Sequence, residues 1–122
     1  MNRKPPLEFL ESLDQDVRDA FKDGAPYPDL TNALITHLYG NLYQRDQLNL
    51  RERLLVTIAV LMFSGNMQPQ LATQTRIALK NGITRQDLME VALQISAFGG
   101  FANSINAAYV VDSVADTIED IP

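Results

Sequence analysis

The chain has 122 residues, of which 46% are hydrophobic, with no cysteine and a net charge of −5. This length is enough for one domain with an ordinary hydrophobic core, and we expect that domain to span residues 1–122. The lack of cysteine excludes disulfides, thiolate metal sites and thiol chemistry, and it agrees with a location in the reducing cytoplasm. The longest apolar run, residues 54–63, covers about half of a membrane span, so we predict a buried helix and no membrane segment.

The charges are distributed unevenly along the chain. Residues 1–44 carry four Lys/Arg and seven Asp/Glu, residues 45–85 carry six and two, and residues 86–122 carry none and six. The acidic total argues against nucleic-acid binding, which requires a basic face. The basic middle segment could attract a small anionic ligand such as a carboxylate. Alternatively, its arginines form ion pairs with the acidic ends, within one subunit or between two.

Helical periodicity predicts about six helices and no strand, which is the pattern of an all-α bundle. The first helix runs from Pro5-Pro6 to about Lys22, where Gly24 closes it. Asp29 is a candidate N-cap for the second helix, which ends at Tyr39-Gly40. The expected inner face of this second helix carries Leu30, Ala33, Leu34, Leu38 and Leu42.

The remaining four helices follow one another with short connections. The third covers residues 49–63, the fourth 69–82 and the fifth 84–98, and the last begins near residue 102. A capping pattern opens the fifth helix at Thr84-Arg-Gln-Asp87. The third helix is apolar on nearly every side, which in a chain of this length indicates that a partner subunit covers it. We therefore expect a homo-oligomer.

Two polar residues have a structural and a functional interpretation. Asn49-Leu-Arg-Glu52 has the form of a capping box, which gives Glu52 a structural role that competes with a weak catalytic one. His37 is the single histidine, and no Cys, Asp or Glu stands at ligand spacing from it. Packing or an oligomer contact is therefore favoured over a metal site, and we expect no metal and no other cofactor.

Five segments in the middle and C-terminal parts carry a family resemblance through their order and spacing. They are Leu38-Tyr-Gly, Leu48-Asn-Leu-Arg-Glu-Arg-Leu-Leu-Val-Thr-Ile-Ala, Leu71 with Arg76-Ile-Ala-Leu-Lys-Asn-Gly, Ile83-Thr-Arg-Gln-Asp-Leu-Met-Glu-Val and Ala97-Phe-Gly-Gly-Phe-Ala-Asn-Ser-Ile-Asn-Ala-Ala. Over about residues 30–112 the chain resembles the carboxymuconolactone decarboxylase family, within the alkylhydroperoxidase D-like superfamily. The resemblance implies an all-α bundle that usually assembles as a homotrimer or homohexamer through a helical hairpin, here residues 69–82 and 84–98.

The chain departs from this family at the residues that usually carry activity. Peroxidase members usually have a Glu relay, Cys-x-x-Cys and a His, whereas this chain has Leu54 at the Glu position and no Cys. Thiol peroxidase activity is therefore excluded. Decarboxylase members usually have a His where this chain has Gln74. A side-chain amide can hydrogen-bond a developing oxyanion, but it does not exchange a proton near neutral pH.

Two functions remain after these exclusions. The first is a lyase acting on a small carboxylated lactone or keto acid, in which Gln74 orients the substrate, Arg45 or Arg53 holds its carboxylate, and an unidentified group carries the proton. Glu52, Arg53 and Tyr39 are candidates for that group, and Tyr39 is also a candidate for substrate binding. The second is a catalytically silent helical oligomer that binds a small ligand or a protein partner, with Gln74 as a buried amide and the arginines in interface ion pairs.

Overall fold

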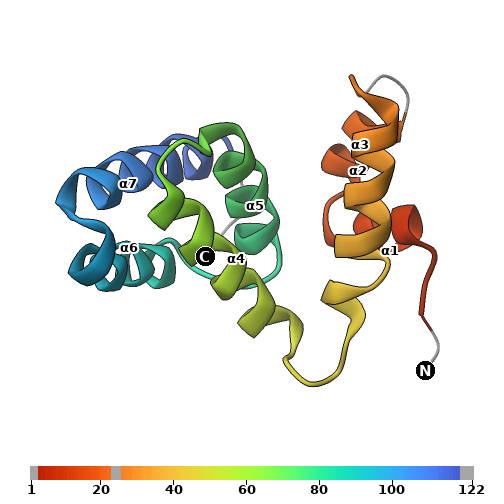
Figure 1. Cartoon of the computed structure of the whole chain (residues 1–122), viewed down its shortest axis with the longest axis horizontal. Coiled ribbons are helices and arrows are strands. Elements are labelled where there is room, and N and C mark those ends of the chain that lie inside the picture. Colours follow the sequence, from red (N-terminus) through yellow and green to blue (C-terminus); the bar gives the residue numbers. More distant parts are fainter. Residues whose placement is uncertain (1–2, 23–25, 119–122) are drawn as a thin grey trace. The chain divides into compact units, whose positions relative to one another are not determined.

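The computed structural model describes residues 3–22 and 26–118 (Figure 1). Contacts between residues divide the chain into two compact units, Met1–Leu50 and Arg51–Pro122. Every regular element in the described ranges is helical, which confirms the prediction of an all-α fold. The described ranges contain one more α-helix than the periodicity predicts, because the first predicted helix is broken in two. A single domain over residues 1–122 stays a prediction.

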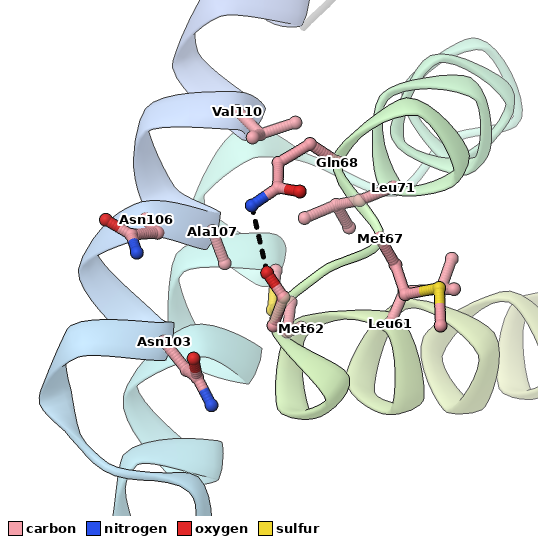
Figure 2. Close-up of a pocket in the computed structure, with 10 residues that line it drawn as sticks. Leu61, Met62, Met67, Gln68, Leu71, Asn103, Asn106, Ala107 and Val110 are labelled. Carbon is pink, nitrogen blue, oxygen red and sulfur yellow. Dashed lines mark hydrogen bonds between the residues drawn. The ribbon is translucent and has the colours of Figure 1, made fainter.

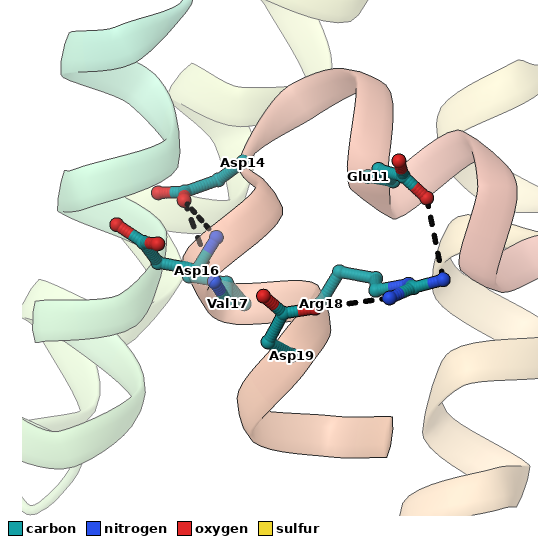
Figure 3. A network of polar contacts seen from close by, with 6 residues as sticks. All are labelled: Glu11, Asp14, Asp16, Val17, Arg18 and Asp19. Atoms are coloured by element: carbon teal, nitrogen blue, oxygen red, sulfur yellow. Dashed lines mark hydrogen bonds and ion pairs between the residues drawn. The ribbon is translucent and has the colours of Figure 1, made fainter.

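That break divides the first predicted helix into α1 (Pro6–Leu13) and α2 (Gln15–Lys22). Asp14 lies between them with extended backbone, at φ −162° and ψ 108°. Its Oδ1 accepts the backbone N–H groups of Asp16 at 3.0 Å and Val17 at 3.4 Å, as Figure 3 shows. Asp14 therefore caps the start of α2. The apolar periodicity continues across the break, which is why the sequence pattern predicts one helix; the predicted end at Gly24 lies outside the described residues.

The second predicted helix differs from expectation at its start and on its inner face. The helix α3 (Pro28–Leu34) begins after Tyr27, and Asp29 lies inside its first turn instead of capping it. Leu30, Ala33 and Leu34 are exposed, so the predicted inner face is wrong for these three residues. The helical period changes only after these three residues, where a π-helical turn, η1 (Ile35–Tyr39), and a 3₁₀ turn, η2 (Leu42–Gln44), follow α3. Each change of period rotates the side chains that come after it, so the buried residues are instead Ile35, Tyr39 and Tyr43.

The N-terminal segment is held against these turns by one amide side chain. Gln44 donates from Nε2 to the carbonyl oxygens of Tyr39 and Lys4, both at 2.9 Å, and its Oε1 accepts the Lys4 N–H at 2.8 Å. Pro6 also packs closely on Gly40, where an added Cβ would lie 2.8 Å from the Pro6 Cγ. These contacts order the start of the chain within its own unit.

The second unit contains four longer helices whose positions confirm the sequence prediction. They are α4 (Leu50–Ser64), α5 (Gln68–Lys80), α6 (Arg85–Gly99) and α7 (Phe101–Ala115). The predicted capping box at the start of α6 is present: Thr84 Oγ1 accepts the Asp87 N–H at 3.0 Å, and Asp87 Oδ2 accepts the Thr84 N–H at 2.9 Å.

Within the unit, the most closely packed pair of these helices is α6 and α7. Figure 1 shows α6 and α7 side by side, and α7 packs most extensively on α6 and next on α5. Gly100 has a φ of 86° and reverses the chain between α6 and α7, so this pair forms the closely packed hairpin. The assembly of subunits through a hairpin of α5 and α6 stays a prediction.

The helix α4 is buried along one side within its unit. Leu54, Ile58 and Met62 form the buried side, whereas Val56, Val60 and Phe63 are exposed. Coverage of the exposed side by a partner subunit stays a prediction. In the described part of the chain no helix has the length and apolar character needed to cross a membrane. A cytoplasmic location also stays a prediction.

Candidate functional site

The five predicted site residues fall in different units. Tyr39 and Arg45 belong to the N-terminal unit, and Glu52, Arg53 and Gln74 belong to the C-terminal unit. Tyr39 is buried, with its ring packed edge-on against Tyr43 at a centroid distance of 5.6 Å, which suits a core residue better than a substrate contact. Arg45 is exposed after η2. A site formed within one unit therefore draws on Glu52, Arg53 and Gln74.

Gln74 lies on the buried face of α5, with 7% of its surface exposed. Leu71, Thr75 and Ala78 share this face because side chains three and four residues apart lie over one another on a helix. The hydroxyl of Thr75 is fully buried and has no hydrogen-bond partner among the described residues. The middle of α5 therefore places an amide and a hydroxyl in the interior of the unit.

A small hollow lies one turn before Gln74, where Leu71 forms part of its wall (Figure 2). It is bordered by the end of α4, the start of α5 and residues 103–110 of α7, and the space open to the centres of water molecules is about 10 Å³. That is room for roughly one water molecule. The polar side chains in its wall are three amides: Gln68, Asn103 and Asn106.

Two of these amides donate to the main chain around the hollow. Gln68 Nε2 donates to the carbonyl oxygen of Gly65 at 2.9 Å, which Figure 2 shows as a dashed line. Asn103 Nδ2 donates to the carbonyl oxygens of Phe63 and Gly99, both at 3.1 Å, and so caps the ends of α4 and α6. The side-chain oxygens of Gln68 and Asn103 remain as acceptors. Because no titratable side chain lines the hollow, it can orient a polar guest but cannot exchange protons with it.

The arginines of the basic middle segment divide into paired and unpaired groups. Arg51 lies 3.3 Å from Asp87, and Arg85 lies 3.4 Å from Asp112 and 2.8 Å from Asp116. These pairs agree with the alternative in which basic residues of the middle meet acidic residues of the C-terminal part. Arg53 differs from them, since it is half-buried and forms no ion pair with a described residue, and its Nε is buried without a hydrogen-bond partner.

Hydrogen bonds and neighbouring charges shift the ionisation of two of these paired residues. The pKa of Asp87 is lowered, chiefly because its carboxylate accepts the Thr84 backbone N–H, with a further contribution from Arg51. The pKa of Arg85 is raised by the hydrogen bond to Asp116 and by the two nearby carboxylates. The same contacts stabilise the charged forms of Asp87 and Arg85, and they join α6 to α4 and α7.

Glu52 and His37 are both exposed. Asn49 directly precedes α4, which is the position of an N-cap residue, and the capping box with Glu52 stays a prediction. His37 lies in η1, and no group of three or more His, Cys, Asp or Glu residues in the described ranges is placed to hold a metal ion.

The comparison with known families gives a match over most of the chain. A model described as the carboxymuconolactone decarboxylase family matches residues 28–113. The chain belongs to the carboxymuconolactone decarboxylase family. The segments that carry the sequence resemblance lie within this match, and so do Gln74 and Arg53.

Three relatives of this family member are similar to it at modest identity. It is 31% identical over 88 residues to an uncharacterized 15.0 kDa protein in the nqo9-nqo10 intergenic region of Paracoccus denitrificans, over 71% of this chain and 66% of that protein. It is 31% identical over 86 residues to a 4-carboxymuconolactone decarboxylase of Acinetobacter baylyi, and the match covers 70% of this chain and 63% of that protein. It is 27% identical over 105 residues to the nitrosuccinic acid decarboxylase npaB of Metarhizium robertsii, and the match covers 85% of this chain and 73% of that protein. The chain thus spans a little under two thirds of the length of the first two relatives.

Sequence reasoning named Gln74 and Arg53 as candidate site residues of this family member, and their roles stay predictions; it did not name the amides around the hollow. Asn103 and Asn106 stand in the last segment of the family resemblance, Ala97 to Ala108, so a signal for them was present. Gln68 precedes Pro69 at the start of α5 and has no comparable signal. The hollow forms only where α4, α5 and α7 meet, which sequence spacing does not predict.

Proposed function

We propose that this family member is a lyase that removes carbon dioxide from a small acid carrying an electron-accepting group, such as a lactone or keto carbonyl. Membership of the carboxymuconolactone decarboxylase family and two relatives named as decarboxylases support the proposal. The names of those relatives describe two small acids, one with a lactone carbonyl and one with a nitro group. Both groups can accept the electron pair that a departing carboxylate leaves behind.

The reaction needs one bond broken and one proton added. The bond between carbon and the carboxylate breaks, its electron pair moves into the neighbouring acceptor group, and carbon dioxide leaves. An N–H of the Gln74 amide would stabilise the negative charge that grows on the acceptor oxygen, in a buried environment where such a hydrogen bond is strong. The carbon is then protonated by water, because an amide does not supply a proton near neutral pH.

The observation that carries the proposal is the guanidinium of Arg53, which has no ion-pair partner among the described residues and whose Nε is buried without a hydrogen bond there. A buried N–H of a charged group without a partner is unfavourable, and a carboxylate of the ligand would provide that partner. The neighbouring cations Arg51 and Arg85 already have carboxylate partners within the chain. Arg53 therefore has the environment expected of a substrate-binding residue.

The test measures carbon dioxide release from 4-carboxymuconolactone and from nitrosuccinic acid by the purified full chain. Arg53→Gln is expected to weaken substrate affinity about tenfold or more, as for the loss of a hydrogen bond to a charged group. The matched control is Lys80→Gln, which removes the same charge from an exposed position at the end of α5 and should leave turnover unchanged. Equal loss in both variants would contradict a specific role for Arg53.

The alternative function is a catalytically silent oligomer that binds a small ligand or a protein partner. The observation that favours it is the hollow lined by amides, next to a buried Gln74 and without a titratable group. On this alternative, the same acids bind with an affinity that depends on Arg53, but no carbon dioxide is released. Turnover that is lost in Gln74→Ala would rule the alternative out.

We also propose that the chain associates with copies of itself as a trimer or hexamer. Support comes from the exposed apolar side of α4 and from further exposed aromatic residues on α6 and α7. Large apolar patches of this kind usually mark a surface that another molecule covers. Sedimentation of the full chain at micromolar concentration tests the association, and a monomer would refute it.

A further inference from the structure

The turn between α5 and α6 contains the single Asn-Gly pair of the sequence, Asn81-Gly82. Asn81 follows the last residue of α5 with φ −115° and ψ 25°, and Gly82 has a φ of 94°, in the left-handed region. The main-chain nitrogen that follows an asparagine can attack the amide carbon of its side chain, because the new bond closes an unstrained ring. In a folded chain this reaction depends on the hydrogen bonding of that nitrogen, on the space around it and on the freedom of the turn.

The main-chain nitrogen of Gly82 is unbonded. Its N–H makes no hydrogen bond to any residue in the described ranges. The N–H groups on both sides of it do, since those of Asn81 and Ile83 both donate to the carbonyl oxygen of Ala78, each at 3.1 Å. A hydrogen bond to the protonated form of a group makes its proton harder to remove. The Gly82 nitrogen is therefore the one in this turn that base can deprotonate most easily.

The space around Gly82 is open. Gly82 is exposed, and a Cβ built on it would meet no atom within 4 Å. Because glycine has no side chain and no neighbour crowds it, the approach of its nitrogen to another carbon is unhindered. Hydroxide and water reach the same place from solvent.

The end of α5 sets how often the two reacting atoms meet. Asn81 Nδ2 donates to the carbonyl oxygen of Ile77 at 2.7 Å, which holds the side chain against the helix end. Closing the ring requires this hydrogen bond to break and the chain to rotate about ψ of Asn81. Both changes take place in the last turn of a helix, where local opening requires the least free energy. The reaction therefore proceeds from the frayed end of α5.

Asn103-Ser104 provides an internal comparison, since a small residue follows this asparagine too. Here the Ser104 N–H donates to the carbonyl oxygen of Gly100 at 3.3 Å. Asn103 lies inside α7, and its amide also donates to the carbonyl oxygens of Phe63 and Gly99. The nitrogen is bonded and the side chain is held at two points, so the same reaction is hindered at this position.

We propose that Asn81 is a site of spontaneous deamidation. The Gly82 nitrogen loses its proton to hydroxide and bonds to Cγ of Asn81, the bond from Cγ to Nδ2 breaks, and Nδ2 leaves as ammonia with a proton from water. Water then opens the resulting succinimide at either carbonyl, which gives aspartate or isoaspartate. No oxidant or reductant takes part. The inference is independent of the proposed lyase activity and of self-association.

Either product weakens the joint between α5 and α6. A carboxylate cannot donate to the carbonyl oxygen of Ile77, and it places a negative charge at the end of α5 where the helix dipole is also negative. Isoaspartate also lengthens the main chain directly before Ile83, whose side chain is buried with 1% of its surface exposed. Conversion at Asn81 is thus expected to lower the stability of the C-terminal unit.

The test is peptide mapping of the full chain by mass spectrometry, after storage at mildly alkaline pH and physiological temperature. Trypsin cleaves after Lys and Arg, so it releases residues 81–85 with Asn81 and residues 86–122 with Asn103 as separate peptides. Digestion in water labelled with heavy oxygen marks any deamidation that occurs during handling. Asn81 should deamidate at least about tenfold faster than Asn103, because opening a helix end requires less free energy than opening a helix interior.

Two variants give matched controls. Asn81→Gln keeps a side-chain amide but would have to close a larger ring, so the modification at this position should disappear while the rate at Asn103 stays the same. Asn81→Asp reproduces one product and should unfold at a lower urea concentration than Asn81→Gln. Equal stability of the two variants would contradict the expected weakening of the joint.

Two results would overturn the proposal. Asn81 could stay unmodified in the folded chain and react only in the chain unfolded in urea, which would show that the native turn keeps the two atoms apart. Alternatively, equal rates at Asn81 and Asn103 in the folded chain would show that the unbonded Gly82 N–H gives no selectivity.

Discussion

Asn103 Nδ2 lies 3.1 Å from the carbonyl oxygen of Phe63, which precedes it by 40 residues, and so joins the start of α7 to the end of α4. The same nitrogen also reaches Gly99 O. One side chain thereby satisfies carbonyl groups at two helix ends that have no partner within their own helices. This contact positions the walls of the hollow in Figure 2.

Asn103→Ala is expected to lower the free energy of unfolding by about 1–3 kcal/mol, because two main-chain acceptors lose their donor. Urea unfolding followed by circular dichroism measures the change. Asn106→Ala is the matched control, since Asn106 lines the same hollow but is exposed. It should change the stability by less than about 0.5 kcal/mol. Similar values for the two variants would contradict the capping role of Asn103.

Gly65→Ala is expected to destabilise the chain more than Gly82→Ala. Both glycines have positive φ, 83° and 94°, so each alanine costs about 1–2 kcal/mol in backbone energy. At Gly65 the new Cβ would also lie 2.7 Å from Asn103 Oδ1, whereas at Gly82 it would meet no atom within 4 Å. The additional loss of stability in Gly65→Ala should disappear when Asn103 is also replaced by alanine. A double-mutant cycle followed by urea unfolding measures this. An excess that persists there would locate the strain elsewhere.

The ion pair and capping box at Asp87 predict a pH dependence of stability. The pKa of Asp87 is lowered from its ordinary value of 3.8, so its contribution is present above that value and is lost as the pH falls through the lower, folded-state pKa. The stability difference between wild type and Asp87→Asn should therefore be constant near neutral pH and should shrink below about pH 4. Thermal unfolding from pH 7 to pH 2 measures it. A difference that stays constant over the whole range would contradict the shift.

Gln74→His is expected to increase carbon dioxide release and to introduce a pH dependence near the ordinary histidine pKa of about 6.5. A histidine at this position can return a proton to the carbon, and general acid catalysis typically contributes about 10²–10⁴-fold. The pH profile of kcat distinguishes this effect from a change in packing, which would not produce an inflection. A folded Gln74→His variant with unchanged, pH-independent turnover would show that protonation does not limit the rate.

The positions of α4 to α7 could be predicted from the sequence because their ends are fixed by local signals. Pro69, the Thr84 capping box and the glycines at 82 and 100 each act within a few residues of the helix ends that they determine. The N-terminal unit could not be predicted as well. Asp14 caps α2 without interrupting the apolar periodicity. The π-helical turn at Ile35–Tyr39 rotates the side chains that follow it, and no residue type in this segment predicts such a turn.

The candidate site shows the same division between local and non-local information. The sequence identifies Gln74 through the family resemblance and identifies Arg53 as one cation among several in the middle segment. Only the fold shows that Arg51 and Arg85 have carboxylate partners on α6 and α7 while Arg53 has none among the described residues. Ion pairs between residues 27–36 positions apart depend on where the helices lie in space, which the spacing along the chain does not determine.

By itself, the sequence determined that the chain is helical and that it lacks thiol chemistry. These properties follow from residue types and from interactions within one helical turn. That the Gln74 amide stands where decarboxylase members have a histidine stays an expectation from the family resemblance. The tertiary structure alone decided which cations are neutralised, which apolar side chains remain exposed on α4, α6 and α7, and where a hollow of about one water forms. Those properties depend on contacts between distant segments, whose energies are set by packing in three dimensions.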